Sequence, residues 1–381
     1  MALVLNDEQK MLRDSAQSFL AERAPVAHLR KLRDGNDSLA YSRELWSQFA
    51  EQGYCSILIP ERHGGLGLGV FEAGLISENI GHTLTPAPFI SSAVLAPWLI
   101  AHAGSDAQKT RLLPLIGKGQ RLLALAIDER SKHNPTAIAT QATAKGGTSG
   151  AAASGYVING SKTFVLDAYG ADELIVVART AANALSLFLV DAKLRGVTIE
   201  RTAMVDSNNA ARVRFDQVTV GADALIGKLG EGAALLDQAL DVGRVVVAAQ
   251  LLGIADEVFA RTMDYIKQRK QFDKIIGEFQ ALQHRAAELF CDIEITRAIV
   301  LKALQAVDRD VASAALTVAQ AKARACVTAN RAVQESVQMH GGIGMTDAID
   351  IGLFMKRARA LIELFGDAGF HADRVAKMGS Y

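Results

Sequence analysis

The hydrophobic pattern changes its period twice along this chain, and that change limits the fold more than any other feature. Residues 1–121 place apolar side chains at helical spacing, and residues 228–381 do so again. Residues 122–227 instead carry short β-branched runs separated by turn residues. Because a helical period does not fit one face of a sheet, the sequence predicts a β domain flanked by two helical domains. The predicted fold class is therefore α+β, mainly α.

The middle segment has the pattern of an all-β domain. Five apolar runs follow one another without a helical segment between them, at residues 156–158, 174–177, 187–190, 197–199 and 213–220. Parallel strands need long crossover connections, which are usually helices. This order therefore favours an antiparallel sheet or barrel over a parallel sheet of strand–helix–strand units.

Charge and cysteine content exclude several classes of function. The 381 residues include 41 Lys and Arg against 41 Asp and Glu, so the formal net charge is zero. Nucleic-acid binding and attachment to anionic membranes need a basic surface that this composition does not supply. The three cysteines, Cys55, Cys291 and Cys326, are too far apart for a zinc knuckle or a disulfide scaffold. No apolar run reaches the ~20 residues of a spanning helix, so we expect a soluble protein. The scattered cysteines favour the reducing cytoplasm, and we expect no metal site.

Two segments of the C-terminal part carry residues that a simple helical bundle does not require. Arg269 and Gln271 precede a turn at Gly277, where a guanidinium and an amide can reach a phosphate. Residues 338–344 read Gln-Met-His-Gly-Gly-Ile-Gly, a glycine-rich stop at the end of a long helical pattern. Taken alone, each segment also has an ordinary explanation. Arg269 can be one exposed cation among several, and the glycines can cap a helix.

These two segments, together with others in the same order along the whole chain, resemble the acyl-CoA dehydrogenase family. The Arg-x-Gln-Phe, Phe-Gln-x-x-Gln and Gln-x-His-Gly-Gly-x-Gly motifs stand at residues 269–272, 279–283 and 338–344. Further matches stand at residues 60–67, 155–162 and 241–244. The resemblance implies a helical N-terminal domain (1–121), a middle antiparallel β-barrel (122–227) and a C-terminal four-helix bundle (228–381).

The resemblance also implies that FAD binds between subunits. By analogy, Arg269 contacts the FAD pyrophosphate of a neighbouring subunit, and six further residues line the ADP half. Those residues are Gln271, Phe272, Gln280, Gln338, Gly341 and Gly342. A chain that supplies such contacts to its neighbour is at least a dimer, and the family suggests a homotetramer built as a dimer of dimers.

The residues expected at the flavin ring depart from the family pattern. Residues 164–167 read Phe-Val-Leu-Asp where the family commonly has Trp-Ile-Thr-Asn. Phe164 can still cover the rim of the isoalloxazine, whereas Leu166 has no hydroxyl to offer the flavin N5. The family's Thr-Glu-Pro loop appears as Ile-Asp-Glu-Arg at residues 127–130. We therefore expect FAD to bind, and the tuning of its redox chemistry stays open.

The reaction of this family needs a carboxylate that removes the α proton of an acyl thioester. The family places it at one of two positions. The first holds Gly243 here, and the second falls in residues 364–368, Leu-Phe-Gly-Asp-Ala, where the Glu is replaced. Asp367 is the candidate displaced base, and Glu363 is less suited because it falls within the preceding helix. Asp367 could equally be a turn or cap residue.

Three further residues are candidates for roles near the substrate. By family analogy Asp241 and Arg244 face the thioester cavity, although residues one helical turn apart can also form an ion pair on a solvated face. His340 has no second metal-ligating residue at suitable spacing, so we interpret it as structural.

The resemblance therefore predicts an acyl-CoA dehydrogenase that converts an acyl-CoA to the trans-2-enoyl-CoA. An electron-transferring flavoprotein would receive the electrons, as in fatty acid β-oxidation. The ending Phe-Gly-Asp-Ala also resembles the smaller subunits of heteromeric acyl-CoA dehydrogenases, where a larger partner subunit can carry the base. Two alternatives stay open: a flavin oxidase or monooxygenase on the same fold, and a non-catalytic FAD-holding subunit of a hetero-oligomer.

Overall fold

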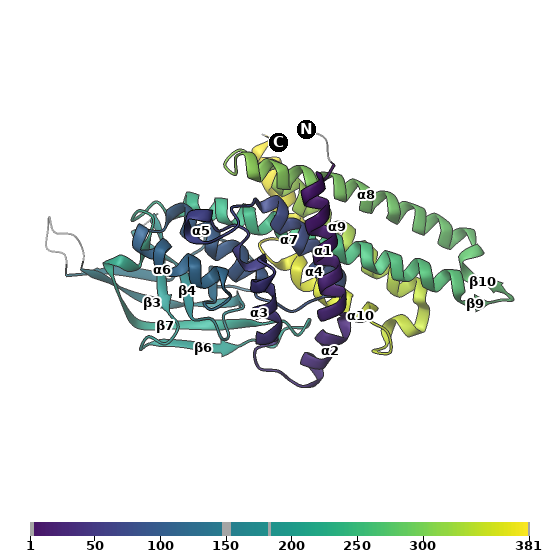
Figure 1. Ribbon diagram of the computed structural model, residues 1–381, viewed down its shortest axis with the longest axis horizontal. Coiled ribbons are helices and arrows are strands. Elements are labelled where there is room, and N and C mark those ends of the chain that lie inside the picture. The colour runs from purple at the N-terminus through teal and green to yellow at the C-terminus, as the bar shows by residue number, and fades with distance from the viewer. Residues whose placement is uncertain (1–3, 147–153, 182–183, 380–381) are drawn as a thin grey trace. The chain divides into compact units, whose positions relative to one another are not determined.

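The computed structural model describes residues 4–146, 154–181 and 184–379, and Figure 1 traces its helices and strands. The chain forms two compact units. The first consists of Met1–Lys31, Val70–Thr85 and Arg244–Tyr381, and the second of Leu32–Gly69 and Pro86–Gly243. Helix α7 (Gly232–Gln268) contributes residues to both units.

The first unit is helical, as the periodicity predicts. Its helices besides α7 are α1 (Asp7–Arg23), the start of α2 (Val26–Asp34), α4 (Val70–Thr83), α8 (Gln280–Arg309), α9 (Ala315–His340), α10 (Ile351–Glu363) and α11 (Ala368–Met378). Helix α9 contacts α8, α10 and α11. Helices α4 and α7 approach very closely, because a Cβ added at Gly253 would lie 2.0 Å from the main-chain oxygen of Glu78. The C-terminal helices therefore pack as a bundle to which an N-terminal helix is added.

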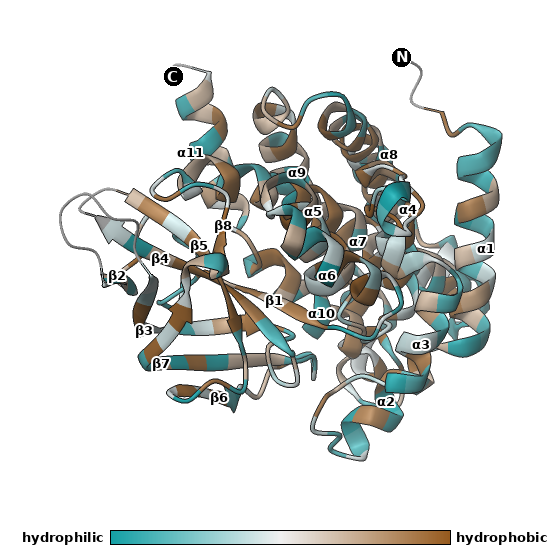
Figure 2. Ribbon diagram, turned by 60° about the vertical axis from the view of Figure 1, so that its left-hand side comes forward, coloured by the Kyte–Doolittle hydropathy of each residue, from teal (hydrophilic) through white to brown (hydrophobic). Residues whose placement is uncertain are grey.

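The second unit combines short helices with the β-sheet. Its helical segments are α3 (Arg43–Glu51), η1 (Tyr54–Ser56), η2 (Glu61–His63), η3 (Phe89–Leu95), α5 (Ala96–Ala103), α6 (Asp106–Gly117) and η4 (Ala222–Ala224). Its strands are β1 (Leu123–Ala126), β2 (Gln141–Lys145), β3 (Gly155–Leu166), β4 (Glu173–Ala181), β5 (Ala184–Asp191), β6 (Val197–Arg201), β7 (Ala210–Gly221) and β8 (Leu225–Ile226). Strand β7 alternates between buried and exposed residues, whereas β5 is buried along almost its whole length. Figure 2 shows the alternation as changing colours along β7.

The predicted antiparallel β-barrel is wrong, because the sheet is open. The strands follow the order β6-β7-β3-β2-β4-β5-β8, and among the described strands the two ends of this path do not pair. Strand β1 pairs with β4 in parallel, and β2 also meets β4 in parallel at one residue pair. Short apolar runs predict strands, but closure depends on strand tilt and register, which the runs do not encode. Here the edge strands β6 and β8 have only five and two residues.

Candidate functional site

A short hairpin follows α7 and carries the first predicted motif. Its strands are β9 (Lys270–Gln271) and β10 (Lys274–Ile275), which pair antiparallel. Between them Phe272 and Asp273 both have positive φ, 55° and 61°. A two-residue hairpin turn needs such angles so that its twist matches the twist of the two strands. The turn places Phe272 at the tip, where 85% of it is exposed. The predicted cofactor residue Phe272 is therefore freely accessible on the surface of the single chain.

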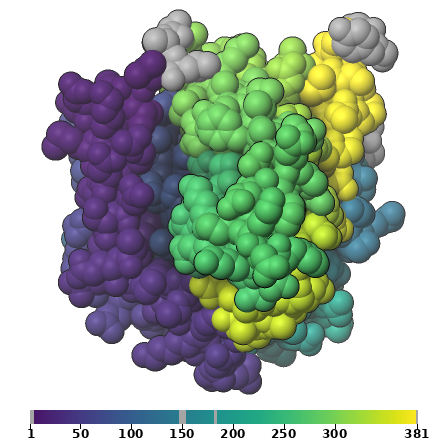
Figure 3. Space-filling model, turned by 90° about the vertical axis from the view of Figure 1, so that its right-hand side faces the viewer, coloured from purple at the N-terminus to yellow at the C-terminus, as the bar shows by residue number. Residues whose placement is uncertain are grey.

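The second motif lies beside the first. Helix α9 ends at His340, and the short helix η6 (Gly341–Met345) follows. The rings of Tyr265 and His340 stack with centroids 4.3 Å apart, and the Tyr265 hydroxyl donates to the His340 main-chain oxygen at 3.3 Å. These contacts join the end of α7 to the end of α9. In Figure 3 the green segment around residues 270–280 and the yellow-green residues 341–350 lie on one face.

The seven residues predicted to bind the pyrophosphate and the ADP half are all exposed in the single chain: Arg269, Gln271, Phe272, Gln280, Gln338, Gly341 and Gly342. Within the described part of the chain, Arg269 forms no ion pair. Added Cβ atoms at Gly341 and Gly342 would have no atom within 4 Å, so their backbone faces open space. Helix α8 begins at Gln280 without a side-chain cap, which leaves N–H groups at its positive end. Guanidinium, amides and bare backbone form a donor set suited to a dinucleotide.

The residues expected at the flavin ring lie in the second unit. Phe164 has φ 49° and is 48% exposed, at a register shift of β3 between Lys162 and Val165. The fully buried Lys162 holds the preceding loop through Glu129 Oε1 at 2.8 Å and the main-chain oxygen of Ile127 at 3.0 Å. Burial lowers the pKa of Lys162 to about 8, and the Glu129 carboxylate opposes that shift. The irregular strand thus presents Phe164 outward on a firmly held segment.

The candidate base lies in the turn between α10 and α11. Phe365 has φ 58° and Gly366 has φ 106°, so two successive residues adopt positive φ. Asp367 is the N-cap of α11, and its Oδ1 accepts a hydrogen bond from Phe370 N–H at 2.8 Å. Glu363 instead pairs with Arg359 at 2.8 Å. The cap contact that the sequence allowed therefore exists, and the catalytic role of Asp367 stays a prediction.

Gly366 occupies a position that a side chain would not fit. A Cβ added there would lie 2.3 Å from the Phe370 ring and 3.0 Å from His371 Nε2. The positive φ adds backbone strain for any other residue. Glycine is therefore required at this point of the turn.

Three buried groups with hydrogen-bond donors surround this turn. Arg244 Nε donates to the Phe365 main-chain oxygen at 3.3 Å, and His371 Nε2 donates to the same oxygen at 3.1 Å. Lys322 Nζ donates to the Gly366 main-chain oxygen at 3.0 Å. Burial lowers the pKa of His371 to about 2, with the charges of Lys322 and Arg244 adding to the shift, so the imidazole is neutral.

The predicted substrate residues are both buried. Asp241 is 2% exposed and Arg244 1% exposed, so the alternative of an ion pair on a solvated face is wrong. Their role toward the thioester stays a prediction. Sequence reasoning missed Lys322, although it interrupts the buried small-residue stripe of Ala319 and Cys326 on α9. A charged residue within an apolar helical stripe is the signal that could have revealed it.

Comparison with known proteins decides the family. Family models of the three acyl-CoA dehydrogenase domains match this chain. The N-terminal domain matches residues 6–120, the middle domain 127–218 and the C-terminal domain 230–379. The chain belongs to the acyl-CoA dehydrogenase family. It is therefore an FAD-dependent oxidoreductase.

Named relatives span nearly the whole chain. The mitochondrial long-chain specific acyl-CoA dehydrogenase of Sus scrofa is 31% identical over 354 residues, covering 90% of this chain and 79% of the relative. The ChsE4-ChsE5 complex from Mycobacterium tuberculosis matches with 26% identity and TM-score 0.89, covering 100% of this chain and 99% of that chain. Butyryl-CoA dehydrogenase from Megasphaera elsdenii shares the fold with TM-score 0.90 and 24% identity, covering 100% of both chains.

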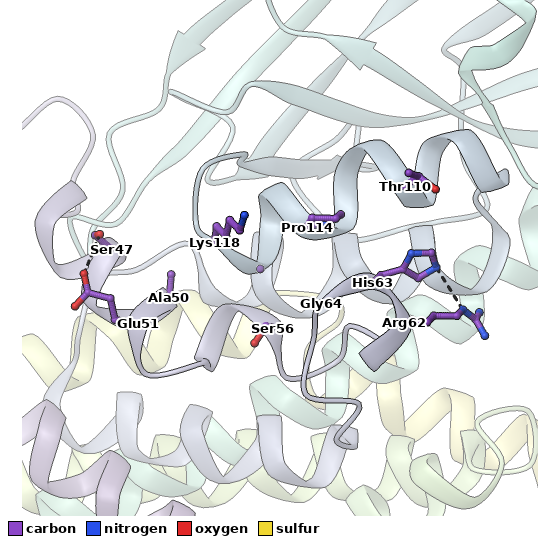
Figure 4. Close-up of a pocket in the computed structure, with 11 residues that line it drawn as sticks. Ser47, Ala50, Glu51, Ser56, Arg62, His63, Gly64, Thr110, Pro114 and Lys118 are labelled. Carbon is purple, nitrogen blue, oxygen red and sulfur yellow. Dashed lines mark hydrogen bonds between the residues drawn. The ribbon is translucent and has the colours of Figure 1, made fainter.

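A separate cavity of about 740 Å³ lies within the second unit of this acyl-CoA dehydrogenase. Figure 4 shows Ser47, Ala50 and Glu51 of α3 on one side and Thr110 and Pro114 of α6 on another. The cavity also includes Arg62, His63 and Gly64 from the glycine-rich segment at residues 60–67. None of the predicted cofactor or substrate residues lines it.

One group of side chains in the described part of the chain has metal-ligand spacing. It consists of Glu78 and His82 on α4 with Asp256 on α7. The Arg297 guanidinium donates to Glu78 Oε1 at 2.9 Å and to Asp256 Oδ2 at 2.5 Å. Because a guanidinium already binds both carboxylates, this group is an ion-pair network. None of the described helices combines the length and the apolarity needed to cross a bilayer.

Proposed function

We propose that this chain oxidises an acyl-CoA thioester to the trans-2-enoyl-CoA and that an electron-transferring flavoprotein receives the electrons. The observation that carries the proposal is the exposed donor surface of Arg269, Gln338 and Gly341, joined by the Tyr265–His340 stack. A mitochondrial long-chain acyl-CoA dehydrogenase among the relatives supports the same reaction class. Such a reaction belongs to the β-oxidation of acyl chains.

The residues of this chain would perform distinct tasks. Arg269, Gln271, Gln280 and Gln338 would hold the phosphates and the ADP half through charge-assisted and amide hydrogen bonds. Phe164 would cover the isoalloxazine rim. Bound FAD supplies the acceptor for the hydride that leaves the β carbon. Asp367 would accept the α proton, because its carboxylate stands at the start of α11, where the helix N-terminus favours a negative charge.

The exposed donor surface also supports a homo-oligomer. Phe272 and the surrounding polar groups lack the cover that a ligand site needs to exclude water, and a second copy of the chain would supply it. We propose a homodimer or a homotetramer on this ground. A light-scattering mass equal to a single chain at micromolar concentration would contradict it.

Turnover with different electron acceptors tests the proposed function. Purified protein is mixed with a panel of acyl-CoAs of different chain lengths, and enoyl-CoA formation is followed with an electron-transferring flavoprotein as acceptor. We expect turnover that needs this acceptor and consumes no oxygen. Oxygen consumption at the same rate without the acceptor would instead indicate a flavin oxidase.

A second function is favoured by the replacement of the family's Glu at both of its positions. The first position holds Gly243, and residues 364–368 carry no Glu. The solved structures similar to this chain include the two-component ChsE4-ChsE5 complex. The alternative proposal is a non-catalytic FAD-holding subunit whose larger partner supplies the base. Protein that binds FAD but turns over substrate only after a second subunit is added would support it.

A further inference from the structure

Lys322 is a fully buried lysine to which the proposed reaction assigns no role. It lies on α9 and is 0% exposed. Its Nζ donates to the main-chain oxygens of Leu361 and Ile362 at 3.2 Å each and of Gly366 at 3.0 Å, and it lies 3.2 Å from Cys326 Sγ. An ammonium has three hydrogens, so the three carbonyl oxygens match it. A buried ammonium is very unfavourable without such partners, so these carbonyls are needed to keep the Lys322 ammonium in the fold.

The carbonyls that Lys322 binds belong to the end of α10 and the turn after it. Leu361 and Ile362 are among the last residues of α10, whose carbonyls have no partner within the helix. The same carbonyls form the negative end of the helix dipole. Lys322 therefore caps α10 from a neighbouring helix and places a positive charge at its end.

The turn needs such support because its backbone is strained. Phe365 adopts φ 58°, a region that non-glycine residues rarely occupy, and Gly366 follows at φ 106°. Arg244 on α7 and His371 on α11 bind the Phe365 oxygen, and Lys322 on α9 binds the Gly366 oxygen. Strained backbone persists only where the surroundings hold it, so contacts from three helices fix this turn.

We propose that Lys322 is the positioning residue for Asp367. By holding the Gly366 carbonyl, it fixes the residue directly before the N-cap, and its charge favours the ionised carboxylate. The inference rests on the proposed function, since it assigns how the candidate base of that reaction is held. It places Lys322 in the role of orienting another group, not of touching substrate.

The charges near Lys322 are consistent with this role. Burial lowers the pKa of Lys322, while the Cys326 thiol and the Asp367 carboxylate oppose that shift and Arg244 adds to it. Burial raises the pKa of Cys326, and the carboxylates of Asp367 and Glu363 act in the same direction. His371 is neutral, and Lys322, Arg244 and Arg374 are cations that act on it. Lys322 and Asp367 therefore act on each other as opposite charges at this turn.

Three variants of the FAD-loaded protein test the proposal. Lys322→Met removes both the charge and the donors, and Lys322→Gln removes the charge but keeps two N–H donors. Lys162→Met is the matched control, because Lys162 is equally buried and binds a carboxylate and a carbonyl in the other unit. For each protein we measure FAD content, the melting temperature and the rate at which a saturating acyl-CoA bleaches the flavin across the pH range.

The proposal predicts a shift in pH dependence that loss of packing alone does not produce. In both Lys322 variants the acid limb of the bleaching rate moves to higher pH, because a carboxylate without its neighbouring cation protonates more readily. The plateau rate falls by about 10- to 100-fold in Lys322→Met, since small misplacement of a reacting group has effects of that size. It falls less in Lys322→Gln. FAD content is unchanged in both Lys322 variants. Lys162→Met can lose FAD, because Lys162 holds a segment expected at the flavin ring, but its acid limb does not move.

An acid limb that stays at its wild-type position in a folded Lys322 variant would overturn the proposal, even if the melting temperature falls. If Lys322→Met does not fold, Lys322→Gln alone decides, because both variants lack the charge. Wild-type flavin that no acyl-CoA bleaches is a different result. It rejects the proposed function of the chain, and with it the role of Asp367.

Discussion

The ring of Tyr265 stacks on the imidazole of His340, with the ring centroids 4.3 Å apart and an angle of 25° between their planes. Tyr265 lies four residues before Arg269, and His340 lies two residues after Gln338. The His340 Nδ1 also contacts the main-chain oxygen of Ser336 at 2.7 Å. This pair therefore connects the arginine motif to the glycine motif, which are about 70 residues apart in the sequence.

Replacing Arg269 by Ala should reduce the FAD content of the purified protein. A hydrogen bond to a charged group contributes about 1.5 to 3 kcal/mol, so FAD binding should weaken by roughly 10- to 150-fold. Flavin absorbance per protein after gel filtration measures the loss. Lys267→Ala is the matched control, because it removes an exposed cation two residues away and should leave the flavin content at the wild-type level. Equal flavin content in the two variants would count against the assigned site.

Removing the ring of Tyr265 should also weaken FAD binding, although Tyr265 itself need not touch the cofactor. An aromatic pair contributes about 0.5 to 1.5 kcal/mol beyond its buried area, so Tyr265→Leu should bind FAD about 2- to 10-fold more weakly. Tyr265→Phe keeps the stack and loses only the hydroxyl contact, so it should lie closer to wild type. Titration of the apoprotein with FAD measures both. The reverse order of the two variants would refute the connecting role of the stack.

Asp367→Asn should remove most of the dehydrogenation by this chain while FAD stays bound. A positioned base contributes about 100- to 10,000-fold to a rate. Asparagine is as good an N-cap as aspartate, so α11 and the overall stability should be preserved. Glu363→Gln serves as the control, because it removes a nearby carboxylate that pairs with Arg359 and should retain its activity. Stopped-flow flavin bleaching compares the variants, and full activity of Asp367→Asn would place the base elsewhere.

His371 should make the folded protein lose stability in acid. Its pKa is about 2 in the fold, against 6.5 for the free side chain, mainly because it is buried. Between these values the unfolded chain binds a proton that the folded chain does not, so stability is full above pH 6.5 and decreases below it. The contribution of this residue falls by about 1.4 kcal/mol per pH unit.

Urea unfolding at several pH values measures that slope. The variant His371→Gln should lack this part of the acid sensitivity, whatever its stability at neutral pH. If the free energy of unfolding falls equally per pH unit in wild type and variant, His371 already binds a proton in the folded protein. The assignment of a buried neutral imidazole is then wrong.

The periodicity of the sequence predicts the helical and β regions because burial of one face repeats along each element. It does not predict the open sheet, since the edge strands β6 and β8 are recognised only from their pairing. Nor does it predict that β1 joins β4 in parallel, because that pairing connects segments about 50 residues apart. Local patterns encode elements, whereas register between distant strands depends on the whole packed unit.

The motifs around Arg269 and residues 338–344 are visible in sequence because their residue types are unusual for a bundle. The contacts that hold the turn around Asp367 are not visible in this way. In sequence Lys322 is only a charge within an apolar helical stripe, and its partners at the end of α10 and in the turn before α11 are visible only in the fold. The requirement for glycine at 366 likewise comes from the Phe370 ring, four residues later in the next helix.

Single-turnover mixing of the FAD-loaded wild-type protein with acyl-CoA under anaerobic conditions tests the central claim most directly. We expect at least one acyl-CoA to bleach the flavin, with one equivalent of trans-2-enoyl-CoA formed for each flavin reduced. Oxidised flavin and unchanged thioester with every acyl-CoA, whether or not a second subunit is added, would contradict it.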